Sequence, residues 1–183
     1  MSEELARLAQ LLAARDALDA QIAELVGRSA RPGDVGEFIA ARIFDLELAA
    51  SATQAGYDGE FRSGPLAGRT VNVKTYGDVL GGLDIGAHPC DYTLVLTGPP
   101  RGGPAGVHHH HRWRITGVYL FEMTQLLATL TARGVKIGIA TSLRKADVQA
   151  AQIFPQRDRS PLQLAPDQIR LLRLFAGTAA TAT

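Results

Sequence analysis

The chain has 183 residues, 46% of them hydrophobic, and a formal net charge of +1 at pH 7. This is enough apolar material for one globular domain, and the single cysteine, Cys90, excludes an intramolecular disulfide framework. No run of 18 apolar residues occurs and the first residues are acidic, so we expect a soluble, cytoplasmic protein without a membrane span or secretory signal.

The small net charge conceals an asymmetry between the two parts of the chain. Residues 1–60 hold 5 Lys/Arg and 11 Asp/Glu, whereas residues 61–183 hold 14 and 7. A basic second part favours contact with a polyanion, because phosphate contacts supply most of the non-specific affinity for nucleic acid. The alternative is that the two parts attract each other within the fold.

Residues 3–27 predict a long helix. Most of its apolar residues fall on heptad a and d positions, with Arg15 at the remaining a position: Leu8, Leu11, Leu18, Ile22 and Leu25. Three more apolar residues widen this stripe: Leu5, Leu12 and Val26. A wide stripe favours docking on the chain's own domain, and the alternative is a homodimer through this helix. We therefore expect a helical extension over 1–30, a domain over 31–177 and a disordered tail over 178–183.

Residues 34–48 predict a second helix, and two strands follow it. The strands cover residues 56–62 and 69–76, and the turn-rich sequence SGPLAG between them predicts a hairpin. The later pattern predicts a strand at 90–98, a Gly/Pro-rich loop at 98–111, a strand at 112–121, a helix at 123–134, a strand at 135–142, a helix at 143–154 and a short helix that begins near Pro166. The predicted fold class is α/β, an α+β sandwich with a mixed central sheet flanked by helices.

The hairpin brings residues of opposite charge together. Asn72 and Lys74 are two apart on a strand and project to one face, while Val71 and Val73 face the core. The preceding strand folds back alongside, which brings Asp58 towards Lys74. A carboxylate, a backbone carbonyl and a lysine at a sheet edge can hold a hard cation and orient a water molecule. Glu37, on the preceding helix, is the natural fourth group.

These residues resemble the signature of the PD-(D/E)xK nuclease superfamily, and more narrowly an uncharacterised bacterial group within it. The matching motifs are GDVGEFIAARIF with Glu37, GYDG with Asp58, and VNVK with Asn72 and Lys74. The resemblance covers residues 33–97 well and the rest of the chain by the order of its elements. It implies a restriction-endonuclease-like core and a metal-dependent nuclease.

The resemblance also implies a role for each residue. Asp58 and Glu37 would bind Mg²⁺ or Mn²⁺, Asn72 would ligate directly or through water, the backbone carbonyl of Val73 would complete the set, and Lys74 would position the hydrolytic water. Four arginines of the basic part would hold the backbone of nucleic acid, expected to be DNA: Arg62, Arg69, Arg112 and Arg114.

One position departs from the family pattern. Asn72 stands where an acid is usual, and because an amide brings no charge, metal affinity should fall. The alternative function is therefore a catalytically silent nuclease-like module that binds nucleic acid, or a protein partner through the N-terminal helix.

Each residue also has a structural interpretation. Asp34 and Glu37 are spaced as in a capping box, Asp58 could be a turn residue, and Lys74 could protect a strand edge. Further residues could assist the site or serve the fold. Asp84 and Asp91 could assist, and Asp91 could instead begin a strand; Cys90 and Trp113 are expected in the core. The tract His108–His111 is expected to bind metal only adventitiously.

Overall fold

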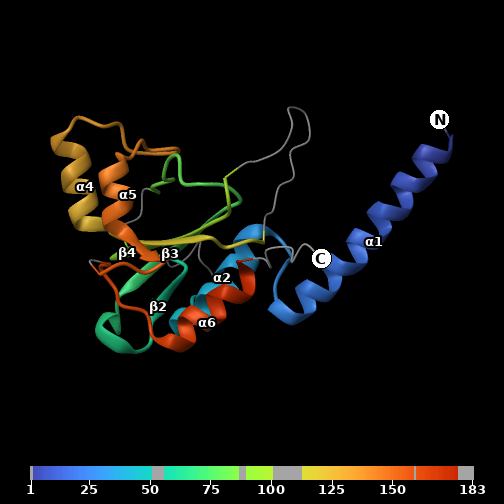
Figure 1. Cartoon of the computed structure of the whole chain (residues 1–183), viewed down its shortest axis with the longest axis horizontal. Helices are drawn as coiled ribbons and strands as arrows, with labels where there is room; N and C mark the ends of the chain where they lie inside the picture. Colours follow the sequence, from blue (N-terminus) through green and yellow to red (C-terminus); the bar gives the residue numbers. More distant parts are fainter. Residues whose placement is uncertain (1, 51–55, 87–89, 101–112, 159, 177–183) are drawn as a thin grey trace, which may run out of the picture.

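The computed structural model describes residues 2–50, 56–86, 90–100, 113–158 and 160–176. Within these residues the chain forms a mixed α/β unit with a long helix at its N-terminus (Figure 1). The predicted fold class is confirmed at this level: helices flank a mixed sheet. The predicted tail 178–183, the tract His108–His111 and Arg112 lie outside the described residues.

The described strands form one sheet whose spatial order follows the chain. They are β1 (Leu46–Leu48), β2 (Gly59–Phe61), β3 (Thr70–Tyr76), β4 (Tyr92–Thr97), β5 (Gly117–Glu122) and β6 (Gln152–Phe154). Neighbouring strands are antiparallel except β3 and β4, which are parallel. As predicted for a strand inside a sheet, β4 is buried from Thr93 to Thr97.

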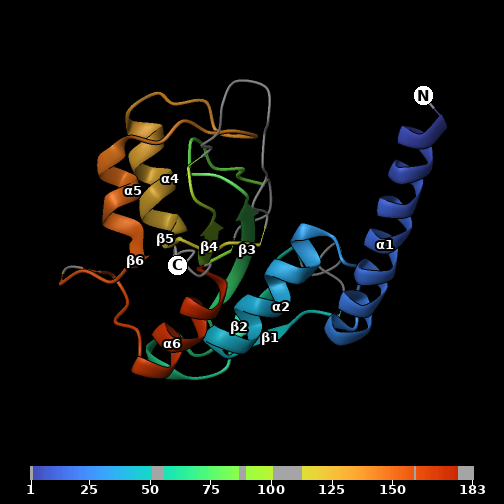
Figure 2. The ribbon, with the colours of Figure 1, turned by 45° about the vertical axis from the view of Figure 1, so that its right-hand side comes forward.

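The helices cover both faces of the sheet. They are α1 (Ser2–Val26), α2 (Pro32–Phe44), α4 (Met123–Ala132), α5 (Lys145–Ala151) and α6 (Pro166–Phe175). Helices α2 and α6 lie on one face, while α4 and α5 lie on the other (Figure 2). Each face therefore has its own apolar core, and side chains that alternate along a strand enter different cores.

Three predicted elements are wrong in extent or type. The helix predicted over 34–48 ends at Phe44, because Asp45 adopts the left-handed conformation with a φ of 53°, and the next residues form the edge strand β1. The segment 135–142, predicted as a strand, makes a single bridge between Leu83 and Thr141. The end of the predicted helix 143–154 is strand β6, where Ile153 is fully buried beside β5. At the C-terminal ends of both predicted helices, pairing with a neighbouring strand overrides the local apolar pattern.

Strand β5 begins at Gly117, later than the predicted 112–121. Trp113 therefore precedes the strand and is 38% exposed, so its predicted core position is wrong. The other predictions for this region hold: α4 follows β5, and Gly134 lies just past its end with a φ of 66°. Pro166 opens α6 as predicted.

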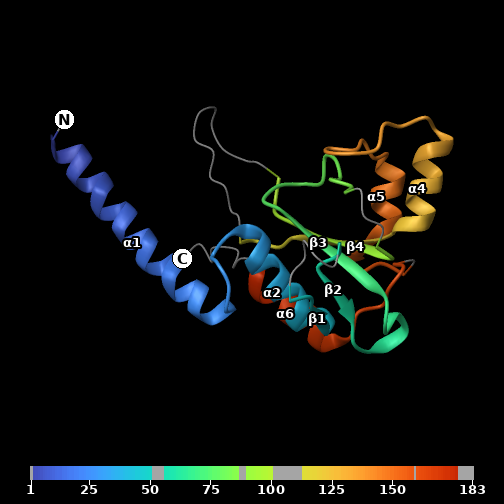
Figure 3. The same cartoon turned by 180° about the vertical axis from the view of Figure 1, so that it is seen from behind.

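Helix α1 extends away from the sheet (Figure 3). Among its apolar residues, Ile22 and Val26 pack against the core beside α2, whereas the leucines of the preceding turns are exposed. The predicted docking of the whole stripe on the chain's own domain is therefore wrong. In the described part of the chain, no helix combines the length and apolarity needed to cross a membrane.

Helix α2 approaches β3 very closely. A Cβ atom at Gly36 would lie 1.9 Å from the Oγ1 atom of Thr75, so only glycine fits there. The Thr75 hydroxyl is buried by this contact and has no hydrogen-bond partner among the described residues. The absence of a side chain at Gly36 therefore sets the height of α2 above the sheet.

We predict that Gly36→Ala destabilises the fold by about 1–3 kcal/mol, although alanine is the better helix former. Gly33→Ala is the matched control, because nothing lies within 4 Å of a Cβ atom there. It should leave the stability unchanged or raise it by up to about 1 kcal/mol. Urea denaturation measures both, and equal effects of the two substitutions would contradict the close approach.

Asp91 ties the start of β4 to β3. Its Oδ2 atom accepts hydrogen bonds from the backbone N–H and the hydroxyl of Thr70, each at 2.8 Å, and its Oδ1 atom lies 3.0 Å from Arg69 Nη1. The hydrogen bonds from Thr70, the backbone one first, lower the pKa of Asp91. Asp91 was predicted either to assist the site or to begin a strand, and these bonds to Thr70 favour the second role.

Because this pKa is lowered in the folded state, ionised Asp91 stabilises the fold above its unfolded pKa of about 3.9, and that stability is lost as the pH falls through the folded pKa. The excess stability of the wild type over Asp91→Asn should therefore be fully present near neutral pH and shrink as the pH is lowered below about 3.9. Urea denaturation across this range tests it, with Asp167→Asn, an exposed carboxylate, as the control. A difference that does not change with pH would contradict this role.

Candidate functional site

Asp58 lies where β2 separates from β3. Its backbone N–H donates to the Val71 carbonyl at 3.1 Å, and its side-chain Oδ2 accepts from the Val73 N–H at 2.7 Å. The carboxylate thus takes the place of the backbone acceptor that a longer β2 would offer to Val73. Gly59, the next residue, lets β1 approach, since a Cβ atom there would lie 2.6 Å from the Glu47 carbonyl oxygen.

Strand β3 presents the predicted alternation. Val71 and Val73 are buried in the core on the α2 face, at 0% and 6% exposure. Asn72 and Lys74 are half-buried and share the other face. The Asp58 carboxylate accepts from the N–H of Val73, the residue between Asn72 and Lys74, so the hairpin holds Asp58 at this part of β3.

Glu37 projects from α2 and forms an ion pair that the sequence did not predict. Arg28 Nη1 lies 2.7 Å from Glu37 Oε2, and the two side chains are 33% and 14% exposed. The same guanidinium donates through Nη2 to the Ala49 carbonyl at 3.0 Å. Arg28 therefore links the end of α1 to α2 and to the residue that follows β1.

The capping-box interpretation of Glu37 is wrong. Helix α2 has Arg31 as its N-cap, so Asp34 lies in the first turn and Glu37 lies further inside the helix. The Asp34 carboxylate accepts a hydrogen bond from the Ser29 hydroxyl instead. Glu37 is therefore free of a role in starting its own helix.

The pKa of Glu37 responds to charges on the hairpin and on Arg28. The pKa of Glu37 is raised, first by burial and then by the negative charge of Asp58. The positive charges of Arg28 and Lys74 act in the opposite direction. A partly buried carboxylate whose pKa is raised by a second carboxylate favours a nearby cation.

The donor set suits a hard cation only in part. Asp58, Glu37 and Asn72 offer oxygen atoms, which Mg²⁺ and Mn²⁺ prefer. However, within the described ranges no three or more Asp, Glu, His or Cys side chains form a group that could hold a metal ion. The third oxygen donor is the neutral amide of Asn72, and Arg28 already balances the charge of Glu37.

Of the arginines predicted to hold phosphates, the three in the described residues are exposed, and two of these have acidic partners. Arg62 lies 4.0 Å from Asp45, and Arg69 pairs with Asp91. Arg114 is exposed just before β5. Asp84 was predicted to assist the site, but its Oδ1 atom accepts a hydrogen bond from the Ala140 N–H at 2.7 Å. Together with the bridge between Leu83 and Thr141, this bond holds Asp84 to the segment 138–141.

Cys90 was predicted to be a buried residue at the start of a strand. It lies two residues before β4, as expected, but is only half-buried. Its Sγ donates to the Tyr92 carbonyl at 3.2 Å. Burial raises the pKa of the thiol, although hydrogen bonds from Thr93 and the backbone of Asn72 act to lower it. A protonated thiol is a poor nucleophile, so Cys90 serves the packing beside the site.

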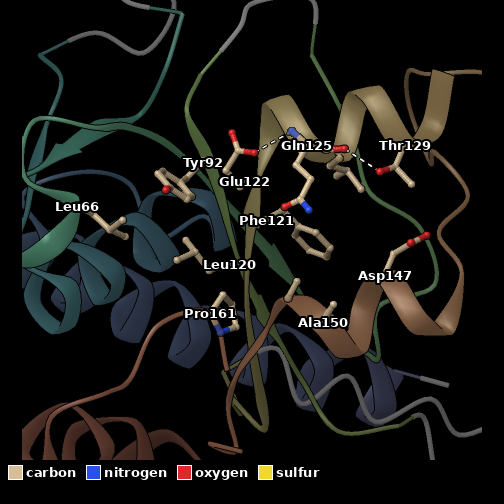
Figure 4. Close-up of a pocket in the computed structure, with 12 residues that line it drawn as sticks. Leu66, Tyr92, Leu120, Phe121, Glu122, Gln125, Thr129, Asp147, Ala150 and Pro161 are labelled. Atoms are coloured by element: carbon tan, nitrogen blue, oxygen red, sulfur yellow. Dashed lines mark hydrogen bonds between the residues drawn. The ribbon is translucent and has the colours of Figure 1, made fainter. Parts of the chain in front are cut away.

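A separate cavity of about 260 Å³ lies between β5, α4 and α5 (Figure 4). Its two carboxylates, Glu122 and Asp147, already have partners. Both Glu122 oxygens accept backbone N–H groups of α4, from Thr124 and Gln125, and Asp147 pairs with Arg133 at 2.7 Å. Its lining includes neither Glu37, Asp58 nor Lys74, so this cavity and the candidate site are different places.

Comparisons with protein-family models and with curated proteins find no match for this chain. The candidate site therefore depends on its own geometry. The sequence motifs predict a site of Glu37, Asp58, Asn72 and Lys74. They do not predict Arg28 as the partner of Glu37, because nothing in the spacing between an arginine after one helix and a glutamate inside the next indicates a contact.

We predict that Arg28 and Glu37 are energetically coupled. Arg28→Ala should destabilise the fold by about 1–2 kcal/mol, because it leaves a mostly buried carboxylate without its partner. The same substitution in a Glu37→Gln background should cost less by about 1 kcal/mol, which a double-mutant cycle in urea measures. The exposed pair Arg170 and Asp167 is the control and should show almost no coupling. Additive effects at Arg28 and Glu37 would contradict the prediction.

Proposed function

We propose that this protein is a metal-dependent nuclease of restriction-endonuclease-like fold, which hydrolyses phosphodiester bonds of nucleic acid with Mg²⁺ or Mn²⁺. The observation that carries the proposal is the position of the Asp58 carboxylate, bonded at 2.7 Å to the backbone amide between Asn72 and Lys74. Glu37 lies near enough for the charges of both Asp58 and Lys74 to act on its pKa.

The order of elements also supports the proposal. A helix with a glutamate, α2, precedes the antiparallel strands β2 and β3, with an aspartate immediately before β2 and the Asn-x-Lys sequence in β3. This is the arrangement that the family resemblance implies.

In this proposal each residue has one task. The carboxylates of Asp58 and Glu37 and the amide of Asn72 hold the cation, with the Val73 backbone carbonyl as a further oxygen donor. The cation, when bound, stabilises negative charge on the phosphate. Lys74 orients the attacking water, and the exposed Arg114 binds the phosphate backbone of the nucleic acid. Arg28 must release Glu37 before its carboxylate can serve the cation.

A second candidate function is a catalytically silent nuclease-like module. Two observations favour it: the Arg28 guanidinium already pairs with Glu37 at 2.7 Å, and Asn72 brings no charge to the site. Such a module would use the fold as a scaffold for binding nucleic acid or a protein.

Calorimetric titration with Mn²⁺ and Mg²⁺ decides between the two functions. We expect the wild type to bind the cation and Asp58→Asn to lose most of the affinity, because the amide keeps an acceptor for the Val73 N–H but removes the charge. Asn72→Asp should tighten binding about tenfold by adding a charged ligand. Asp167→Asn, an exposed carboxylate on α6, should bind like the wild type.

The variants that bind the cation are then incubated with plasmid DNA and with RNA. Cleavage that depends on the cation and is lost in Lys74→Met, while cation affinity stays within about threefold, supports the nuclease. No cation binding by the wild type or by Asn72→Asp would refute the nuclease and leave the silent module.

A further inference from the structure

The exposed stripe of α1 holds six of the eleven exposed large hydrophobic residues in the described part of the chain, and the proposed site does not use it. Six leucines of this helix are exposed by about half or more: Leu5 64%, Leu8 50%, Leu11 52%, Leu12 49%, Leu18 59% and Leu25 74%. They lie along a helix of 25 residues, about 37 Å long, that extends away from the sheet (Figure 3). Contiguous exposed leucines at heptad spacing are typical of a helix that pairs with another helix.

The charge of α1 indicates which partner fits this stripe. The helix carries Arg7 and Arg15 against five acidic residues, a net charge of −3: Glu3, Glu4, Asp16, Asp19 and Glu24. This disfavours nucleic acid, because like charges repel. The positions that flank the stripe hold only one basic and one acidic residue, Arg7 and Asp19, so two copies of the helix bring no like charges together along their flanks.

Arg15 determines the orientation of such a pair. It occupies the central a position, and its Nε lies 3.6 Å from Asp19 of the same helix. In a parallel pair the a positions face each other, so Arg15 would meet its own copy. In an antiparallel pair each a position faces a d position, and Arg15 would lie beside a leucine, along which its aliphatic stem can pack.

The position of the domain is consistent with the antiparallel pair. The sheet and its helices are attached at the C-terminal end of α1, where Ile22 and Val26 pack against the core. Antiparallel helices would carry the two domains at opposite ends of the pair, whereas parallel helices would bring both to the same end.

We propose that the protein forms a homodimer in which the leucine stripe of α1 packs antiparallel against α1 of a second copy. A two-fold axis brings the same stripe of both copies together, so one self-complementary face is sufficient. The dimer goes beyond the proposed function, because it requires neither a bound cation nor catalysis.

Sedimentation equilibrium of the full chain over a wide concentration range tests the dimer. We expect the wild type to have the mass of a dimer, and Leu11→Asp/Leu18→Asp to be monomeric with at least about a hundredfold weaker association. These leucines are exposed in the single chain, so the variant should keep its helical circular dichroism. Ala13→Asp/Ala20→Asp is the matched control, because it adds the same charges to exposed positions on the opposite side of the helix.

The control should remain a dimer. A monomeric wild type at every concentration would overturn the proposal, as would a dimer that Leu11→Asp/Leu18→Asp leaves intact. Orientation is tested by nitroxide labels at Glu3→Cys in a Cys90→Ser background, which removes the single native thiol. Labels separated by about 30 Å support the antiparallel pair, and labels within about 15 Å would overturn it in favour of a parallel one.

Discussion

Helix α2 lies so close to strand β3 that Gly36 has no room for a side chain beside Thr75. Glu37 is the next residue along the helix, and its pKa is raised by burial and by the negative charge of Asp58 on the hairpin. Asp58 in turn is held by the Val73 amide, in the place where β2 stops pairing with β3. The candidate site thus depends on one tight contact between a helix and a strand, and on one strand that ends early.

The alternation of β3 was predictable from the sequence, because Val71 and Val73 mark the buried side and leave Asn72 and Lys74 on the other. Strand β1 was not, because its three residues continue the apolar pattern of α2 and become a strand only by pairing with β2. The ion pair of Arg28 with Glu37 was equally inaccessible, since it depends on how the chain turns between α1 and α2. Local pattern specifies which face a residue takes, whereas contacts between elements need the tertiary fold.

Arg28 gives the two candidate functions a common physical basis. Its guanidinium supplies a positive charge for the mostly buried Glu37 carboxylate, which therefore has a charged partner without a metal cation. A divalent cation must compete with the Arg28 guanidinium for Glu37, and the neutral Asn72 amide binds it more weakly than a carboxylate would. Because Arg28 follows α1 directly, and α1 exposes its leucines, the helix that offers the pairing surface also ends beside the candidate site.

The most direct test of the site is to locate the cation itself. Crystals grown with Mn²⁺ give an anomalous diffraction signal that identifies the ion without assumption about its ligands. We predict a peak within about 2.0–2.5 Å of the Asp58 carboxylate, with a Glu37 oxygen turned towards it and Arg28 displaced. A peak at Asp147 or Asp91 only, or none in the chain with Glu37 still paired to Arg28, would contradict the metal site and favour the silent module.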